Sequence, residues 1–230
     1  MAHDGATKES AQPLRVFVIE DHPVVRQGLK DFIDHEDDMT VCGEAENALD
    51  GIRALKERDV DVAVVDLMLP DKGGLELIAD IRERCPDVAV LVLTAREETL
   101  YAERALRAGA RGYMMKGQGL NKIAEGIRCV QRGDIYLSES MANRMLERYI
   151  GRDSTTSGST VAALSDRELQ VFECIGKGLS TRDIAEKLHL SVKTVESYRA
   201  RIKTKLNLEN ATELMVHAVK WVENEHSGIY

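Results

Sequence analysis

The stretch DVAVVDLMLP, residues 61–70, decides the fold of the first part of this chain. Four apolar residues, 62–65, lead directly into the carboxylate of Asp66, and three more apolar residues and a proline follow. A short, continuous apolar run rich in β-branched residues is typical of a strand that is buried on both faces. A buried charge costs several kcal/mol unless it is paired, so Asp66 is either an incidental acid at a strand end or a carboxylate with a function at the mouth of a site.

The same kind of run recurs along the first 115 residues. Apolar runs rich in β-branched residues lie at 14–19, 39–45, 60–65, 88–94 and 112–115. Segments with apolar residues at helical spacing lie at 24–32, 48–56, 75–84, 100–108 and 120–130. Alternating strands and helices predict an α/β fold, a doubly wound parallel sheet covered on both faces, and we expect the flavodoxin-like strand order 2-1-3-4-5. Function collects at the carboxyl ends of the strands in such sheets.

Length and composition indicate a two-domain protein. The chain has 230 residues, of which 43% are hydrophobic and 30% charged, and no apolar run approaches the roughly 20 residues of a membrane span. The first residues are polar and lack the apolar segment of a secretory signal. The four cysteines are far apart and include no C-x-x-C pair, so we expect reduced thiols in a cytoplasmic protein and no zinc site.

The chain divides into four predicted segments. A disordered tail spans 1–12, an α/β domain 13–135, a helix with a flexible linker 136–160, and a second, all-α domain 161–226. Residues 12–134 contain 17 basic and 24 acidic residues, a balance of −7, whereas residues 161–226 contain 10 of each, a balance of zero. This difference in charge indicates that the two domains have separate partners.

Polar side chains follow several of the predicted strands at their carboxyl ends. Glu20 and Asp21 follow the first strand, Asp66 the third, Thr94 ends the fourth and Lys116 follows the fifth. Three carboxylates at one mouth repel one another unless a cation joins them, and hard oxygen ligands suit Mg²⁺. Carboxylates, a divalent metal, a hydroxyl and an ammonium together are typical of a phosphoryl-transfer site. His22, beside the acids, is expected to be structural.

Residues 14–132 resemble the receiver domain of a two-component response regulator. The motifs that carry the resemblance are ED at 20–21, DLMLPDKGG at 66–74, LTA at 93–95 and GYMMK at 112–116. The resemblance implies that Asp66 accepts a phosphoryl group from a histidine kinase.

The same resemblance implies roles for the neighbouring residues. Glu20, Asp21, Asp66 and the backbone carbonyl of Met68 would hold Mg²⁺, with Asp21 binding directly. Thr94 would donate a hydrogen bond to the phosphoryl oxygens and Lys116 would pair with them. Tyr113 matches the aromatic residue that swings inward when Thr94 moves, although an aromatic at such a position also serves in a core or an interface.

The second domain contains a predicted helix-turn-helix at residues 180–206. The sequences SDRE (165–168) and STRD (180–183) fit capping boxes at helix starts, Ser191 starts a third helix, and Asn210 or Thr212 a fourth. The helix after the turn has five basic residues and one acidic residue between positions 193 and 206. In a helix-turn-helix this helix enters the DNA major groove.

The facing of this helix separates core from DNA-reading residues. At about 100° per residue, Val195, Ile202 and Leu206 share one face, which must be core. The candidates for DNA contact lie opposite or at the flanks: Lys193, Thr194, Glu196, Ser197, Ala200, Arg201, Lys203 and Thr204. Glu196 would accept from cytosine N4 in the groove or pair with Lys193 or Arg199 on the helix surface.

The region 161–222 resembles the LuxR-type helix-turn-helix of the NarL/FixJ family. The motifs LSDRE, GLSTRDIAEKLHLSVKTVESYRARIKTKL and NATEL carry the resemblance. Tyr198 stands where many members have histidine. The resemblance implies that the final helix, 211–222, pairs with its twin in a DNA-bound dimer, although core packing also explains its apolar residues.

Together these observations predict a response regulator, not an enzyme beyond self-phosphotransfer and autodephosphorylation at Asp66. Its partners would be a histidine kinase, double-stranded DNA and, on activation, a second copy of the chain. One alternative is a constitutive DNA-binding regulator whose receiver serves only for dimerisation. Another is a hydrolase with Asp66 as nucleophile, but haloacid-dehalogenase-type enzymes need a second acid two residues on, where this chain has Met68.

Overall fold

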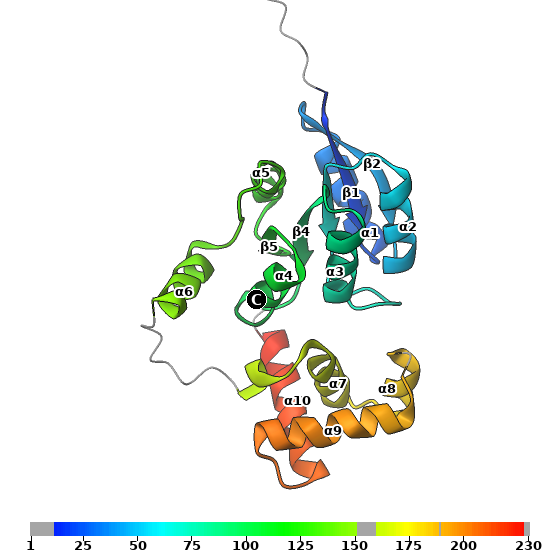
Figure 1. Cartoon of the computed structure of the whole chain (residues 1–230), viewed down its shortest axis with the longest axis vertical. Helices are drawn as coiled ribbons and strands as arrows, with labels where there is room; N and C mark the ends of the chain where they lie inside the picture. The colour runs from blue at the N-terminus through cyan, green and yellow to red at the C-terminus, as the bar shows by residue number, and fades with distance from the viewer. Residues whose placement is uncertain (1–11, 151–159, 189, 228–230) are drawn as a thin grey trace, which may run out of the picture. The chain divides into compact units, whose positions relative to one another are not determined.

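The computed structural model describes residues 12–150, 160–188 and 190–227 (Figure 1). Its contacts form two compact units, one of residues up to 94 together with 105–136, the other of 95–104 together with the residues from 137 onward. The predicted tail, apart from its last residue, and most of the predicted flexible linker lie outside the described residues. In the described part of the chain, no helix has the length and apolar character that crossing a membrane requires.

The first unit contains the predicted parallel sheet. Its strands are β1 (Leu14–Ile19), β2 (Met39–Ala45), β3 (Val62–Val65), β4 (Ala89–Thr94) and β5 (Gly112–Met115). They run parallel in the order β2-β1-β3-β4-β5, which confirms the expected topology. In the register of the central pair, Ile19 lies opposite Val65, so the residues that follow these two strands emerge side by side.

Along the chain, one helix follows each strand of the sheet. They are α1 (Pro23–Ile33), α2 (Ala48–Glu57), α3 (Gly74–Arg84), α4 (Glu98–Ala108) and α5 (Leu120–Gln131). Helix α1 contacts β1 and β2, and α5 contacts β3, β4 and β5, whereas α2 contacts β1, β2 and α3. Each predicted helix exists, with ends that differ from the predicted ends by two residues at most.

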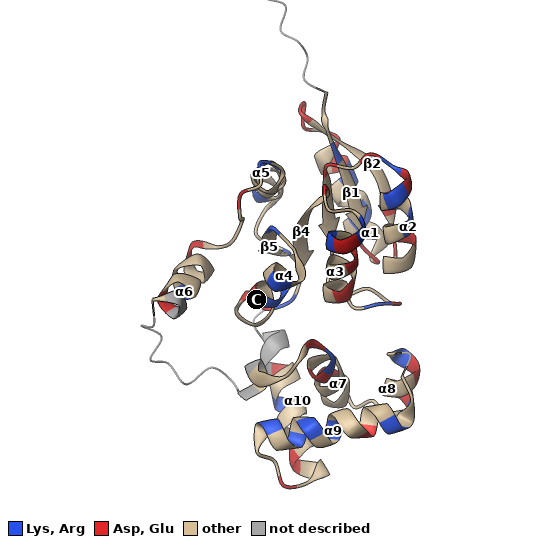
Figure 2. Cartoon of the chain, in the orientation of Figure 1, with Lys and Arg blue, Asp and Glu red and all other residues tan. Residues whose placement is uncertain are grey.

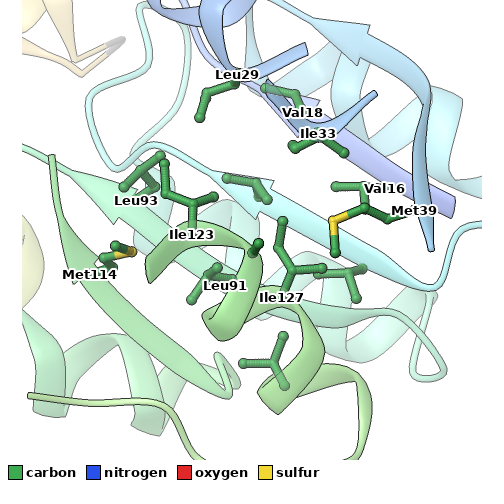
Figure 3. Close-up of a cluster of buried hydrophobic side chains, with 14 residues drawn as sticks. Val16, Val18, Leu29, Ile33, Met39, Leu91, Leu93, Met114, Ile123 and Ile127 are labelled. Carbon is green, nitrogen blue, oxygen red and sulfur yellow. The ribbon is translucent and has the colours of Figure 1, made fainter. Parts of the chain in front are cut away.

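One face of the sheet packs against α1 and α5 to form a single apolar cluster (Figure 3). Alternate strand residues such as Val16 and Val18 meet Leu29 and Ile33 of α1, and Ile127 of α5 joins them. Because side chains alternate between the faces of a strand, the residues between these point to the opposite face. All four residues of β3 are buried, as a strand covered on both sides must be.

The second unit is helical. It contains α6 (Glu139–Tyr149), a short 3₁₀ helix η1 (Thr160–Ala163), α7 (Asp166–Gly176), α8 (Thr181–Lys187), α9 (Val192–Leu206) and α10 (Ala211–Ser227). Both predicted capping boxes are confirmed: Ser165 caps α7 with Glu168, and Ser180 caps α8 with Asp183. Ser191 accepts from the backbone of Thr194 at the start of α9. Contacts of α7 with α9 and α10, and of α8 with α9, hold the helix-turn-helix together.

Candidate functional site

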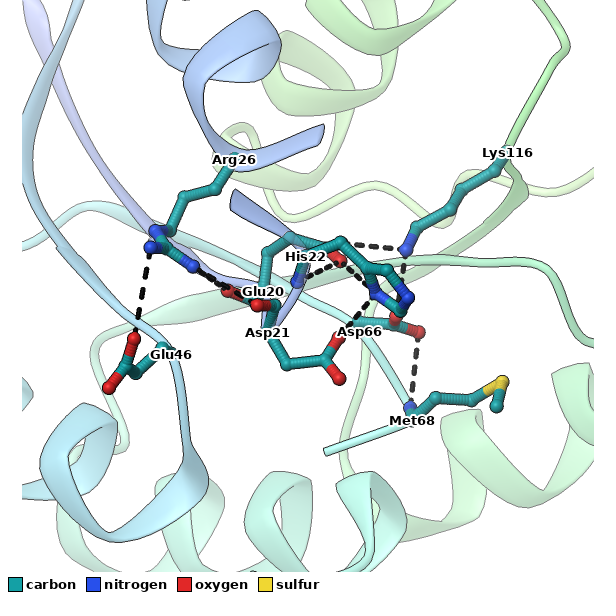
Figure 4. Close-up of polar contacts among 8 residues, drawn as sticks. All are labelled: Glu20, Asp21, His22, Arg26, Glu46, Asp66, Met68 and Lys116. Carbon is teal, nitrogen blue, oxygen red and sulfur yellow. Dashed lines mark hydrogen bonds and ion pairs between the residues drawn. The ribbon is translucent and has the colours of Figure 1, made fainter. Parts of the chain in front are cut away.

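The predicted carboxylates meet at the carboxyl ends of β1 and β3 (Figure 4). Glu20 and Asp66 are buried, with 1% and 2% of their surface exposed, while Asp21 and His22 are more accessible. Ligand atoms of all four residues lie within 4.8 Å of one another. The backbone N–H of Asp66 donates to the carbonyl of Ile19 at 2.9 Å, which fixes the acceptor loop to the end of the neighbouring strand.

The ammonium of Lys116 neutralises the buried part of this cluster. Its Nζ lies 2.7 Å from Glu20 Oε2 and 2.7 Å from Asp66 Oδ2. Burial alone would lower the pKa of this ammonium, but the charges and hydrogen bonds of Asp66 and Glu20 outweigh burial and raise the pKa above its usual value. The Lys116 backbone N–H also donates to the carbonyl of Thr94 at 2.7 Å, so β4 and the cation are directly coupled.

The hydroxyl of Thr94 is the unsatisfied group of the site. The residue is fully buried, and among the described residues its Oγ1 has no hydrogen-bond partner. An unpaired buried hydroxyl costs about 1–3 kcal/mol, so this position favours an acceptor oxygen brought by a ligand. The other Asp66 oxygen, Oδ1, accepts from the backbone N–H of Met68 at 3.1 Å.

The loop after β3 is shaped by close packing. A Cβ at Gly74 would come within 2.4 Å of the Leu67 Cα and 2.7 Å of the Asp66 carbonyl oxygen, so a side chain at position 74 would displace the acceptor loop. Asp71 accepts from the backbone N–H groups of Ala48 and Leu49, each at 2.9 Å, at the start of α2. Burial acts to raise the pKa of Asp71, but these N–H donors lower it below its ordinary value.

Two further residues predicted for the site lie on β5 and in the loop after Asp66. Tyr113 lies on β5 opposite Val92 and is 1% exposed, so its ring faces the interior. The side chain of Met68 is partly exposed beside the acceptor loop.

Two basic residues of the β1–α1 segment belong to the site, and the sequence did not identify their contacts. The ring Nδ1 of His22 lies 2.6 Å from Asp21 Oδ1 and 3.2 Å from Glu20 Oε1, and the bond to Asp21 raises the pKa of His22. The guanidinium of Arg26 binds backbone carbonyls of the same loop. The position of Arg26 could have indicated its contact with this loop. Arg26 lies about one turn into the helix that follows the acids, and side chains on a helix lean toward its N-terminus.

The second candidate site is the exposed face of α9. Val195, Ile202 and Leu206 are buried, which confirms the predicted core face. Of the candidates for DNA contact, Thr194 and Lys203 are half-buried, and the exposed ones are Lys193, Glu196, Ser197, Ala200, Arg201 and Thr204. Figure 2 shows basic residues along this helix. Among the described residues, no ion pair joins Glu196 to Lys193 or Arg199.

Three features of α9 and its neighbours were not predicted from the sequence. Val192, at the start of α9, is 45% exposed, and an exposed apolar side chain at this end would suit contact with a thymine methyl group. The guanidinium of Arg201 lies over the ring of Tyr198, 5.9 Å from the ring centroid, within the roughly 6 Å reach of a cation–π contact. Lys205 pairs with Glu168 of α7 at 2.6 Å and so serves the packing of the domain.

Comparisons with known proteins assign a family to each of the two regions. Residues 16–128 match the family model described as response regulator receiver domain, and residues 162–218 match that of bacterial regulatory proteins, luxR family. The oxygen regulatory protein NreC of Staphylococcus carnosus is 34% identical over 211 residues, which cover 90% of this chain and 97% of NreC. The response regulator UvrY of Escherichia coli is 34% identical over 207 residues, covering 90% and 94% of the two chains.

A solved structure is similar over both regions. RcsB of Salmonella enterica serovar Typhimurium, bound to the promoter rprA in the presence of the phosphomimetic BeF₃⁻, superposes with a TM-score of 0.67 at 25% identity. The match covers 90% of this chain and 99% of that one.

Proposed function

Because this chain belongs to the response regulators that join a receiver domain to a LuxR-type DNA-binding domain and regulate transcription, we propose that phosphorylation of Asp66 by a histidine kinase controls its dimerisation and DNA binding. The observation that carries this proposal is the buried Asp66 carboxylate, with Lys116 on one oxygen and the unpartnered Thr94 hydroxyl in the same unit. The receiver would span 13–135 and the DNA-binding domain 161–226.

The chemistry follows from these groups. A carboxylate oxygen of Asp66 attacks the phosphorus of the phosphohistidine, an O–P bond forms, and the N–P bond breaks with its electron pair passing to the imidazole nitrogen. Mg²⁺ held by Glu20, Asp21, Asp66 and the Met68 carbonyl would neutralise charge on the phosphoryl oxygens. The donor set supports this role, since its oxygens converge and hard oxygen ligands suit Mg²⁺.

The acyl phosphate at Asp66 would shift the equilibrium between two conformations of the surrounding residues. Lys116 would move from Asp66 to the phosphoryl oxygens, and the Thr94 hydroxyl would donate to them and gain the partner it lacks. Because the Lys116 N–H bonds the Thr94 carbonyl, movement of either residue is transmitted to the ends of β4 and β5. Tyr113, on β5, would change its side-chain position when Thr94 moves. The chain would accept a phosphoryl group on its own Asp66 and would not convert a separate substrate. It would therefore not be an enzyme in the ordinary sense.

An apolar surface beside the acceptor supports docking of the kinase. Val24, in the first turn of α1, is 86% exposed. Next to it, Val25 and Gly28 line a pocket of about 430 Å³ that extends to Lys116. One exposed apolar side chain is common on protein surfaces, so the support for docking comes from the pocket that extends to Lys116 and from the close approach to Asp66 that phosphoryl transfer requires of the kinase.

Binding to DNA would use the exposed face of α9. The face carries Lys193 and Arg201 together with small residues such as Ser197 and Ala200, which let the helix approach base edges. One short helix-turn-helix buries little surface and binds weakly, so a dimer on DNA is part of the proposal. Exposed Met215 and Val216 on α10 would supply the dimer contact. A kinase and DNA as partners place the protein in the cytoplasm.

The test is phosphorylation followed by DNA binding. With acetyl phosphate and magnesium, mass spectrometry should detect one added phosphoryl group on the wild type and on Asp87→Asn, an exposed acid used as control. Asp66→Asn should remain unlabelled, because an amide is not a nucleophile here, and phosphodonor should raise affinity for promoter DNA only where Asp66 is intact. Normal labelling of Asp66→Asn would contradict the assignment. Equal DNA affinity with and without phosphorylation would favour the constitutive regulator.

A further inference from the structure

One side chain from the following helix contacts the backbone on both sides of Asp21 (Figure 4). The Nη1 of Arg26 lies 2.7 Å from the carbonyl oxygen of Glu20 and 3.4 Å from that of Asp21. These carbonyls belong to the two peptide groups on either side of the Asp21 Cα. Fixing both peptide planes fixes the φ and ψ of Asp21, and with them the direction of its Cα–Cβ bond.

The two acids differ in how far they depend on this contact. Glu20 is also held by its own backbone N–H, which donates to the Ala45 carbonyl at 3.0 Å, and by Lys116 on its carboxylate. Asp21 lies beyond the strand, and its carboxylate contacts the exposed ring of His22. The His22 N–H donates to Glu20 Oε1 at 3.1 Å, so the peptide group after Asp21 has a second contact. Arg26 supplies the contact that reaches the carbonyl oxygens on both sides of Asp21.

Arg26 itself is well fixed for this task. Its side chain is 15% exposed, and the carboxylates of Glu44 and Glu46, at the end of β2 and just after it, lie 3.9 Å from its Nε and Nη2. The guanidinium thus ties the β1–α1 loop to the end of the neighbouring strand. A cation near the N-terminus of a helix gains nothing from the helix dipole, so the dipole does not explain an arginine here.

We propose that Arg26 is a positioning residue of the magnesium site, which clamps the Asp21 backbone and thereby aims the Asp21 carboxylate at the metal. This inference rests on the proposed function, since it assumes that Glu20, Asp21 and Asp66 hold Mg²⁺. Outer-shell partners of metal ligands typically contribute 10–100-fold in metal affinity.

The clamp and the charge of Arg26 act on magnesium in opposite directions. A positive charge near the site repels a divalent cation, so an arginine that acted only through its charge would weaken binding, and its removal would tighten it. A clamp strengthens binding by keeping the Asp21 carboxylate in place, and its removal weakens binding. The sign of the change on substitution therefore separates the two roles.

The experiment is a Mg²⁺ titration of the full unphosphorylated chain, followed by the amide chemical shifts of Asp21 and Asp66. Arg26→Ala should weaken Mg²⁺ binding about 10-fold, the lower end of the outer-shell range. Arg26→Lys keeps the charge, but its single nitrogen cannot contact the carbonyls and the Glu44 and Glu46 carboxylates together, so it should also weaken binding. Lys30→Ala removes the same charge one turn further along α1, where the ammonium pairs with Asp34, and should bind Mg²⁺ like the wild type.

A second readout keeps the test independent of folding. Amide hydrogen exchange of Asp21 and His22 should accelerate in both Arg26 variants while exchange in β1 and β3 stays slow, and Arg26→Lys covers the case in which the alanine variant is unstable. Tighter Mg²⁺ binding by Arg26→Ala, or unchanged binding by both variants, would overturn the inference and leave the proposed function intact. A wild type that binds no Mg²⁺ would overturn both.

Discussion

Replacing Lys116 by methionine should destabilise the receiver, because the ammonium is the cation between two buried carboxylates. The side chains of Glu20 and Asp66 are each 2% exposed, and each lies 2.7 Å from Lys116 Nζ. Removing one partner of a buried ion pair typically costs 3–5 kcal/mol. The Lys116 side chain is 22% exposed and retains some water, so we expect the lower end of this range, about 3 kcal/mol.

Magnesium should remove much of this deficit. A ligand that binds only the folded state stabilises it by RT ln(1 + [L]/Kd), about 2.7 kcal/mol at a hundredfold excess over Kd. In Lys116→Met no ammonium competes for the Glu20 and Asp66 oxygens, so Mg²⁺ should stabilise the variant more than the wild type.

The assay is hydrogen exchange of β1 and β3 peptides in a urea series, with and without Mg²⁺. These strands report the receiver alone, which matters because a two-unit chain need not unfold in one transition. Lys122→Met, an exposed lysine of α5, is the matched control for loss of one charge. If Lys116→Met costs no more than Lys122→Met in the absence of magnesium, the carboxylates are not held in place by the ammonium, and the electrostatic account of the site is wrong.

Three further predictions test the surfaces and the DNA-binding domain. Val24→Asp should slow phosphotransfer from the kinase at least tenfold while labelling by acetyl phosphate stays normal; equal loss with both donors would contradict a docking role. Glu196→Ala should relax preference at one base pair of each half-site, worth roughly 1–3 kcal/mol on a panel of site variants; an even gain in affinity for all sequences would show that Glu196 only repels phosphates. Stability of the helical unit, followed by Trp221 fluorescence in urea, should fall as pH drops below about 4.3, since Lys205 and Ser165 outweigh burial and lower the Glu168 pKa. Glu168→Gln should weaken this pH dependence, to which Glu173 also contributes, and an unchanged acid limb would refute the role of Glu168.

The sign of this last effect follows from linkage. The folded pKa of Glu168 is lower than its unfolded value, so the contribution is fully present above the unfolded pKa. It is lost as pH falls through the folded pKa, where the carboxylate is protonated in both states. The side chain is only 4% exposed, so solvent screens the pair with Lys205 little on the Glu168 side.

The sequence was sufficient to predict the sheet and the acid cluster because both depend on local patterns. Buried strands require apolar residues, and a parallel topology brings their carboxyl ends to one edge, which places Asp66 next to Glu20 without knowledge of any other contact. The caps at Ser165 and Ser180 were predictable for the same reason, since a capping box is a four-residue pattern.

The contacts of Arg26 and Lys205 could not be predicted in this way. Arg26 binds two backbone carbonyls, and a carbonyl leaves no mark in the sequence because every residue has one. Lys205 contacts Glu168, 37 residues earlier, and the pairing depends on how α7 packs against α9. Grouping of residues 95–104 with the second unit also follows from contacts distant in sequence.

The pairing of Lys205 changes how the charge of α9 should be interpreted. Five basic residues on one helix suggest that all of them serve DNA, but Lys205 donates to a buried carboxylate at 2.6 Å and to the carbonyl of Ala163 at 3.2 Å. Moving its ammonium to a phosphate would leave Glu168 buried and unpaired, a cost comparable to breaking a buried ion pair. On the proposed DNA-binding role, the phosphate contacts of α9 would therefore come from the basic residues before Lys205, and Val192 and Glu196 would lie near the bases. DNA recognition would then depend on the first three turns of α9, while Lys205 in its last turn holds the helix to α7.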